Sequence, residues 1–384
     1  MKIKLPKAGG GSETYTLTGE PLADRKPKAP FNRVAFAAAH VVVDPFAGAD
    51  PSADPAFDWK ATLRYRTRLL DLGFGIAEAM DTSQRGMGLS WASALELIRQ
   101  SLAHAGSRKD MIYSGVGTDH LPAADARSLD DVIAAYLMQL HAVQKLGGRV
   151  ILMASRALVR VAKSPDDYAK VYGRVLSEAD HPVILHWLGE MFDPALAGYW
   201  GGNDFARTME TSLGVIHDNV RHVDGIKVSL LDDQKEVLMR RKLPASVKMY
   251  TGDDFNYPDL IAGDEQGYSH ALLGIFDGIA PVASAAMGAL AKGDRKTYDT
   301  LMTPTVPLSR LIFRSPTQYY KTGIVFLAWL NGFQDHFVMV NGAQAMRPMA
   351  YFTELFKLAD QARLLRKPDL TVKRMKQLLA VYGA

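Results

Sequence analysis

The chain has 384 residues, 48% of them hydrophobic, so it can bury the core of one large domain or two small ones. Its formal net charge is only +4, and its basic residues are spread along the sequence, which excludes the basic stripe that is typical of nucleic-acid-binding proteins. It contains no cysteine, which excludes disulfides, thiolate catalysis and zinc–thiolate sites.

Residues 1–30 form a polar extension with no apolar stretch of secretory length. No later run approaches the ~18–20 apolar residues of a membrane span. We therefore expect a soluble, cytoplasmic protein whose partner is a small molecule, with neither nucleic acid nor membrane as a partner.

Eight short apolar runs predict eight β-strands, at residues 33–39, 73–80, 111–115, 149–153, 182–186, 224–228, 247–251 and 271–275. The runs are continuous rather than alternating, as in parallel strands that are covered on both faces. Helical stretches separate them, with start signals at Ser90, at Ser128 with Asp131, and at Ser164-Pro165. The alternation predicts an α/β fold, a (β/α)₈ TIM barrel over residues 31–295. A doubly wound sheet is the alternative, but the first strand lacks a glycine-rich phosphate turn.

Residues 296–384 predict a C-terminal helical segment packed on the barrel. Apolar stretches at 308–313, 324–331 and 350–365 are compatible with helices, and residues 366–384 end in a basic amphipathic helix. Such a helix can lie on a membrane surface, but we favour packing on the barrel or on a second subunit. We expect a homo-oligomer, either a dimer or a tetramer.

Active sites of TIM barrels lie where the strands end and the following loops begin. Polar residues concentrate at those positions here, which predicts a functional site. They are His40, Asp44, Asp81, Thr82, Ser83, Thr118, Asp119, His120, Ser155, Arg156, His186, Lys227, Ser229, Asp253, Asp254 and Asp277.

Lys227 is the most informative of these residues, because it lies in the apolar run of the sixth predicted strand. Lysine is rarely fully buried without a purpose, and burial lowers the pKa of its ammonium group. A neutral amine can attack a ketone or aldehyde to give a Schiff base. The alternative is a structural lysine paired with Asp224 or Asp254.

Several segments resemble the superfamily of dihydrodipicolinate synthase and N-acetylneuraminate lyase, which are class I aldolases. They follow in the family's order over residues 34–290, and no single motif is specific. The matching segments are Asp44-Pro45-Phe46, Gly115-Val116-Gly117-Thr118, Pro182-Val183-Ile184-Leu185, Gly225-Ile226-Lys227, Tyr250-Thr251-Gly252-Asp253-Asp254 and Ile279-Ala280-Pro281. The resemblance implies a (β/α)₈ barrel in which Lys227 forms the Schiff base without a cofactor.

Two departures from the family bear on the substrate. The family's carboxylate-binding loop Gly-Thr-Thr-Gly-Glu is replaced here by Asp81-Thr82-Ser83-Gln84-Arg85, and Asp81 would repel a carboxylate. The family's proton-relaying tyrosine is replaced by His186, which can do the same work because its ordinary pKa is close to neutrality.

We therefore predict a lyase, an aldolase or a related dehydratase that acts on a small keto-sugar or sugar-derived keto acid. Lys227 and His186 are the predicted catalytic residues, assisted by Thr82 and Ser83. The predicted substrate-binding residues are His40, Asp81, Asp119, His120, Gly252, Asp253 and Asp254.

Two other functions remain open. Histidines and carboxylates around a barrel mouth can hold a divalent metal, as in sugar isomerases, epimerases and hydrolases. The spacing His186-x-x-x-Glu190 is the nearest approach to such a motif, and it needs a helix that this strand does not predict. A barrel with an altered carboxylate loop can also be a non-catalytic sugar-binding or regulatory protein.

Overall fold

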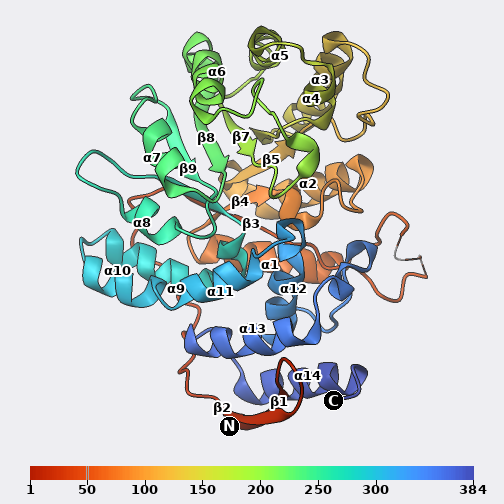
Figure 1. The fold of residues 1–384 in the computed structure, drawn as a ribbon, viewed down its shortest axis with the longest axis vertical. Helices are drawn as coiled ribbons and strands as arrows, with labels where there is room; N and C mark the ends of the chain where they lie inside the picture. Colours follow the sequence, from red (N-terminus) through yellow and green to blue (C-terminus); the bar gives the residue numbers. More distant parts are fainter. Residues whose placement is uncertain (49, 51) are drawn as a thin grey trace.

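The structure, a computed structural model that describes residues 1–48, 50 and 52–384, is built around a closed barrel of eight parallel strands (Figure 1). Each strand pairs with the next in sequence, and β10 closes the barrel against β3. The barrel strands are β3 (Ala35–Ala38), β4 (Gly75–Glu78), β5 (Ile112–Val116), β6 (Arg149–Leu152), β7 (Val183–Leu188), β8 (Val223–Ser229), β9 (Lys248–Thr251) and β10 (His270–Leu273). Each overlaps one of the eight predicted runs, so the predicted TIM barrel is confirmed.

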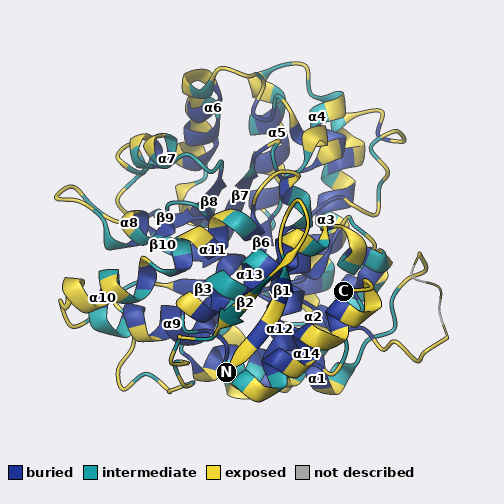
Figure 2. Ribbon diagram, turned by 60° about the horizontal axis from the view of Figure 1, so that its bottom comes forward, coloured by how far each residue is buried: buried dark blue, intermediate teal, exposed yellow. Residues whose placement is uncertain are grey.

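Helices between the strands cover the outside of the barrel, and their exposed outer faces contrast with the buried strands in Figure 2. They begin where the sequence predicts. The Ser90 side chain accepts a hydrogen bond from the backbone of Ser93, and Ser128 and Ser164 each form a capping box. The helices are α1 (Trp59–Asp71), α2 (Trp91–Ala105), α3 (Leu129–Lys145), α4 (Arg156–Val161), α5 (Pro165–Leu176), α6 (Phe205–Asp218), α7 (Asp233–Arg240), α8 (Tyr257–Ala262) and α9 (Ile275–Leu290).

The inside of the barrel is filled by its own cluster of apolar side chains, which include Phe36, Ile151, Ile184, Tyr250 and Leu272. Successive side chains of a strand point to opposite faces of the sheet. The residue two positions beyond an inward-facing residue therefore also faces inward, so that His186, two positions beyond Ile184, lies in an upper layer above this apolar cluster.

The remaining helices form a C-terminal segment that packs against α9 and the barrel. They are α10 (Arg295–Met302), α11 (Thr305–Ile312), α12 (Tyr320–Leu330), α13 (Met349–Gln361) and α14 (Pro368–Val381). Every residue of α12 is buried, since its neighbours α9, α11, α13 and α14 surround it. This segment shares one continuous hydrophobic core with the barrel.

The first residues form an antiparallel hairpin, β1 (Lys2–Pro6) and β2 (Ser12–Thr16), for which the sequence predicted only a polar extension. Figure 1 shows this hairpin beside α13 and α14, so that both chain ends lie together. Asp360 of α13 accepts hydrogen bonds from Tyr15 Oη at 2.8 Å and from the backbone of Thr18 and Gly19. Ile3 and Leu5 are buried, so the hairpin belongs to the core.

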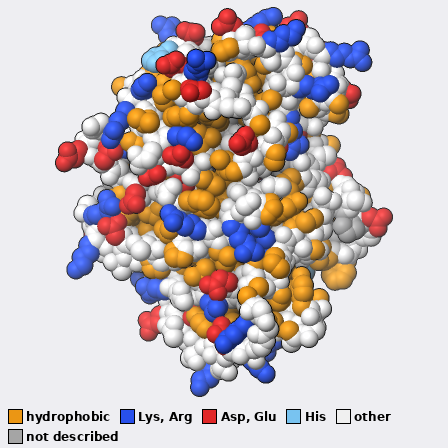
Figure 3. Space-filling view, viewed as in Figure 1, with side chains coloured by type: hydrophobic (Ala, Val, Ile, Leu, Met, Phe, Trp, Pro, Cys, Tyr) orange, Lys and Arg blue, Asp and Glu red, His pale blue; other side chains and the backbone are white. Residues whose placement is uncertain are grey.

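Acidic and basic side chains are interspersed over the face seen in Figure 3, in keeping with the small net charge. None of the helices among the described residues combines the length and the apolar composition that crossing a bilayer requires.

Candidate active site

Lys227 and His186 lie side by side in the upper layer of the barrel. Lys227 of β8 pairs in register with His186 of β7, and His186 is two positions beyond the inward-facing Ile184. Only 5% of Lys227 and 2% of His186 is exposed. The two side chains that the sequence predicts to be catalytic are therefore both buried at the carboxyl ends of neighbouring strands. Active sites of TIM-barrel enzymes lie at this end of the barrel.

The amine of Lys227 has no hydrogen-bond or ion-pair partner among the described residues. Burial lowers its pKa, and the carboxylates of Asp81 and Asp254 oppose this effect only in part. The sequence left open a structural role in which Lys227 pairs with Asp224. Asp224 instead pairs with Lys248, whose Nζ lies 2.6 Å from Asp224 Oδ1. Lys227 is therefore left free for chemistry.

His186 is held in its neutral form. Burial lowers its pKa well below the ordinary value, the charge of Lys227 lowers it further, and Asp81 opposes both effects. Its Nε2 lies 3.1 Å from Ser229 Oγ, which fixes the orientation of the ring. A neutral imidazole that borders the site is a proton acceptor throughout the neutral pH range.

Asp81 begins a short 3₁₀ helix, η1 (Asp81–Ser83), directly after β4. Burial opposes its ionisation, but Lys227, Lys321, His186 and a hydrogen bond from Tyr320 together lower its pKa to about 2. Asp81 is therefore an anion at neutral pH, and its charge interacts with that of Lys227.

The C-terminal segment supplies two side chains to this layer through the first turn of α12. Tyr320 Oη donates to Asp81 Oδ2 at 3.0 Å and shares a hydrogen bond of 2.8 Å with Thr82 Oγ1. Lys321 is 3% exposed, and its Nζ donates to the carbonyl of Gln318 at 3.2 Å. Burial lowers the pKa of Lys321 to about 8, while Asp81 and Asp193 partly offset that effect.

A cavity of about 270 Å³ opens above strands β4 to β7. Asp81 and His186 line it, and Lys227, which pairs in register with His186, is not itself among the lining residues. Its volume is at the small end of the ~300–1,000 Å³ that is usual for ligand pockets, which favours a small substrate. Its other lining residues are Arg85, Gly86, Gly117, Thr118, Asp119, Leu121, Pro122, Ala123, Met153, Ala154, Arg156, Ala157, Leu188, Asp193 and Leu196.

Asp119 forms part of the cavity wall, but its carboxylate is already bound. Arg85 Nε and Nη2 donate to the two oxygens of Asp119 at 2.8 and 2.7 Å. The remaining donors of Arg85 bind Gln139 and the carbonyls of Ala79 and Gly115. The pair is a rigid wall of the cavity. His120 is exposed, hydrogen-bonds to Gln139, and does not line the cavity.

The loop after β9 carries three predicted residues with different environments. Gly252 lies against Lys227, because a Cβ at this position would lie only 2.8 Å from Lys227 Cε. Burial raises the pKa of Asp254 to about 8, so this side chain is protonated at neutral pH, and it accepts a hydrogen bond from the backbone of Ile275 at 2.8 Å. Asp253 instead caps its own loop by accepting hydrogen bonds from the backbone of Phe255 and from Asn256.

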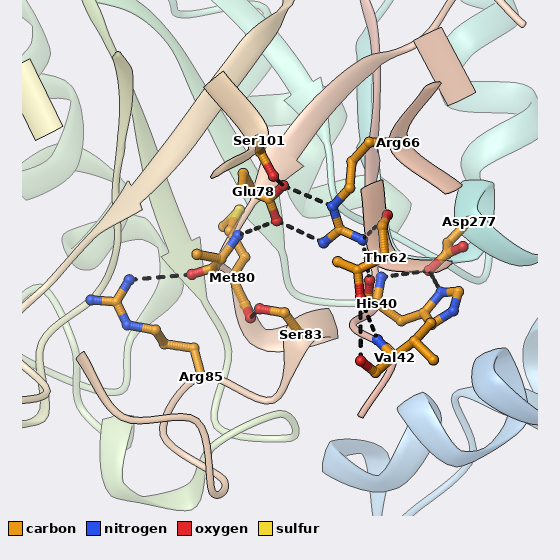
Figure 4. A network of polar contacts seen from close by, with 11 residues as sticks. His40, Val42, Thr62, Arg66, Glu78, Met80, Ser83, Arg85, Ser101 and Asp277 are labelled. Atoms are coloured by element: carbon orange, nitrogen blue, oxygen red, sulfur yellow. Dashed lines mark hydrogen bonds and ion pairs between the residues drawn. The ribbon is translucent and has the colours of Figure 1, made fainter. Parts of the chain in front are cut away.

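His40 and Ser83 are engaged in the buried polar contacts that Figure 4 shows. His40 Nδ1 lies 2.8 Å from Asp277 Oδ2, and its carbonyl accepts from Arg66, which in turn pairs with Glu78. The Ser83 hydroxyl donates to the carbonyl of Met80 at 2.6 Å.

His40, Ser83 and Asp253 thus lie outside the cavity with their polar groups engaged by the protein. The predictions that His40 and Asp253 bind substrate, and that Ser83 assists catalysis, are therefore not carried into the function proposed below.

In the part of the chain that the structure describes, no three histidine or carboxylate side chains converge in a way that could hold a metal ion. Glu190 lies in the loop after β7 and is exposed, so it does not join His186 in a ligand set. The donor arrangement does not favour the metal-dependent alternative.

Sequence reasoning did not identify Tyr320 and Lys321 as site residues. They lie almost 240 residues from Asp81, and no local pattern marks a contact at that separation. The only signal was the presence of a lysine and a tyrosine at the start of an otherwise apolar helix.

Comparisons with known proteins agree with this architecture. A family model with the description "Protein of unknown function (DUF993)" matches residues 3–384. A search of curated proteins finds no match in sequence.

Solved structures match along most of the chain. A 4-hydroxy-tetrahydrodipicolinate synthase from Methylacidiphilum fumariolicum SolV matches with a TM-score of 0.65 and 14% identity, covering 90% of this chain and 99% of that one. A prophage protein of the dihydrodipicolinic acid synthase family from E. coli K12, in complex with pyruvate, matches with a TM-score of 0.67 and 12% identity, covering 87% and 99%.

A chloride-inhibited dihydrodipicolinate synthase from Acinetobacter baumannii, complexed with pyruvate, matches with a TM-score of 0.63 and 16% identity, covering 86% and 99%. The resemblance that the sequence motifs predict is thus confirmed at the level of the fold.

Proposed function

The chain belongs to the family described as "Protein of unknown function (DUF993)", and we propose that it is a lyase, an aldolase or a related dehydratase that forms a Schiff base through Lys227. One observation carries this proposal: a buried, unpaired amine lies in register beside a neutral histidine at the mouth of the barrel. The fold shared with dihydrodipicolinate synthases supports the same chemistry.

The first half of the reaction makes the iminium. The neutral amine of Lys227 adds to the carbonyl carbon of the substrate, and His186 accepts the proton that the new ammonium releases. His186 passes this proton to the alkoxide to give the carbinolamine. A second proton, taken up from solvent through His186, converts the carbinolamine hydroxyl to water, which leaves. The iminium carries a positive charge next to the ionised Asp81, and this anion stabilises the charge where it develops.

The second half uses the iminium as an electron sink. When the neighbouring C–C bond breaks, its electron pair moves into the iminium and gives an enamine, while His186 accepts the proton of the substrate hydroxyl and the carbonyl fragment leaves. His186 then protonates the enamine carbon, and water hydrolyses the resulting iminium to release the ketone and restore Lys227. In a dehydratase His186 first removes a proton from the carbon next to the iminium, and the electron pair of that C–H bond moves into the iminium to give the enamine. The enamine then expels the hydroxyl of the next carbon, which takes the proton from His186 and leaves as water.

The charge of Asp81 bears on the kind of substrate. A 2-oxo acid carries a carboxylate next to its carbonyl, which the ionised Asp81 repels. A hydroxyl group at the same carbon can instead donate a hydrogen bond to Asp81. We therefore propose a small hydroxyketone of the keto-sugar type as the substrate. Thr82 supports this site indirectly, because its hydroxyl holds Tyr320 against Asp81.

The test is reductive trapping with borohydride. The purified protein is incubated with dihydroxyacetone, reduced, and digested for mass spectrometry. We expect Lys227 to gain the probe minus one water plus two hydrogens. Lys227→Arg should abolish this label, because a guanidinium does not form the imine.

The matched control is Lys248→Arg, on the neighbouring strand β9. Lys248 is paired with Asp224, so this variant should be labelled like the unmodified protein. Absence of label at Lys227 with every hydroxyketone and oxo acid tried would refute the proposed function.

A further inference from the structure

Arg156 spans the outer end of the cavity. It follows β6, its Nε donates to Asp193 Oδ2 at 2.6 Å in the loop after β7, and its side chain is 48% exposed. On the opposite side it approaches Gly86 in the loop after β4, where a Cβ would lie 3.9 Å from Nη2 and 4.0 Å from Nη1. The guanidinium is therefore held in one place over the opening.

The two terminal nitrogens of Arg156 donate to no other side chain or carbonyl among the described residues. This distinguishes Arg156 from Arg85, the other arginine of the cavity, whose donors are all used by the protein. A guanidinium that is fixed through Nε and open at both Nη atoms presents the paired donors that match a carboxylate or a phosphate.

The charges of the cavity are ordered from its inner to its outer end. The inner end has the anion Asp81 and the neutral His186, whereas the outer end has Arg156. Lys321 lies close enough to Arg156, Asp81 and Asp193 to interact with all three charges. An anion is therefore disfavoured next to Asp81. Arg156, although its Nε pairs with the lining carboxylate Asp193, offers two open Nη atoms to an anion at the more exposed end.

We propose that Arg156 binds an anionic group, a phosphate ester or a carboxylate, at the end of the substrate remote from its carbonyl. The assignment rests on the proposed Schiff base at Lys227, since that amine fixes which end of the cavity is the reacting one. The substrate is then an acidic hydroxyketone whose carbonyl and anion lie at opposite ends.

The first experiment compares two matched pairs of probes by borohydride trapping at Lys227. Ribulose 5-phosphate is compared with ribulose, and 4-oxopentanoate is compared with 5-hydroxypentan-2-one. We expect at least one anionic probe to reach half-maximal labelling at a concentration about tenfold or more below that of its neutral partner. The pair that shows the difference identifies phosphate or carboxylate.

Arg156→Gln should remove this advantage, so that each anionic probe and its neutral partner reach half-maximal labelling at similar concentrations. Arg99→Gln is the matched control, because Arg99 is an exposed arginine of α2 that pairs with Glu96 outside the cavity. Equal labelling by both members of both pairs would overturn the role of Arg156, and so would an advantage that survives Arg156→Gln.

The second experiment does not depend on Schiff-base formation. In Lys227→Ala, which cannot form the imine, glycerol 3-phosphate should raise the thermal unfolding midpoint while glycerol should not, and the double variant with Arg156→Gln should lose the effect. If this holds while no probe labels Lys227, the anion site stands and the proposed function fails. A rise that persists in the double variant overturns the anion site.

Discussion

Replacing Asp81 by asparagine should turn a site that repels 2-oxo acids into one that accepts them. The surroundings lower the pKa of Asp81 from 3.8 to about 2, which corresponds to roughly 2 kcal/mol at about 1.4 kcal/mol per pKa unit. This shift is the net result of burial, which opposes ionisation, and of Lys227, Lys321 and the Tyr320 hydroxyl, which favour an anion at this position. With a neutral amide there, the same preference becomes available to the carboxylate of a substrate.

An energy of roughly 2 kcal/mol corresponds to roughly 30-fold in an equilibrium constant. We therefore expect Asp81→Asn to raise the labelling of Lys227 by pyruvate about 10- to 100-fold relative to its labelling by dihydroxyacetone, as measured by borohydride trapping at pH 7. Asp254→Asn is the matched control, because Asp254, with a pKa of about 8, is already protonated at pH 7 and the change removes no charge.

An unchanged ratio of the two probes in Asp81→Asn would show that this charge does not set the selectivity. An equal rise in Asp254→Asn would show that the effect is not one of charge. Either result would refute the electrostatic reasoning.

Two further predictions concern proton transfer and stability. His186→Asn should still be labelled at Lys227, but deuterium exchange at the substrate carbon next to the carbonyl, followed by NMR, should fall about 100-fold or more; normal exchange would remove His186 from the mechanism. Burial raises the pKa of Glu236 from 4.5 to about 8, and Ser269 and Thr251 only partly oppose this. The folded protein thus holds this proton more tightly than the unfolded chain, and the associated stability is complete below pH 4.5 and is lost as the pH rises through about 8. Glu236→Gln should therefore match the unmodified protein in thermal unfolding at low pH and exceed it at pH 8; an equal difference at both pH values would contradict this assignment.

The eight strands could be predicted because strands that are covered on both faces require continuous apolar runs, and these runs are visible in the sequence. The helix starts at Ser90, Ser128 and Ser164 could be predicted because capping is a local interaction between near neighbours. The hairpin β1–β2 was missed although Ile3 and Leu5 alternate with lysines, since its buried face is completed only by α13, at the other end of the chain.

The candidate site was predicted less completely than the fold. Lys227 and His186 could be identified because each is a polar residue at the end of an apolar run. His40 has the same signature, yet it lies outside the cavity, because Asp277 binds both its ring and its backbone. The partners of Asp81 could not be predicted, because Tyr320 and Lys321 reach it only through the packing of α12.

The contact between α12 and Asp81 determines where the chain can be shortened without changing the candidate site. A cut near residue 295 would keep all eight strands, yet it would remove Tyr320 and Lys321, two of the groups that lower the pKa of Asp81. It would also uncover the apolar surface that the C-terminal segment shares with the barrel. Grafting the barrel strands onto another scaffold would therefore transfer the lysine without the selectivity, unless the first turn of α12 is transferred with them.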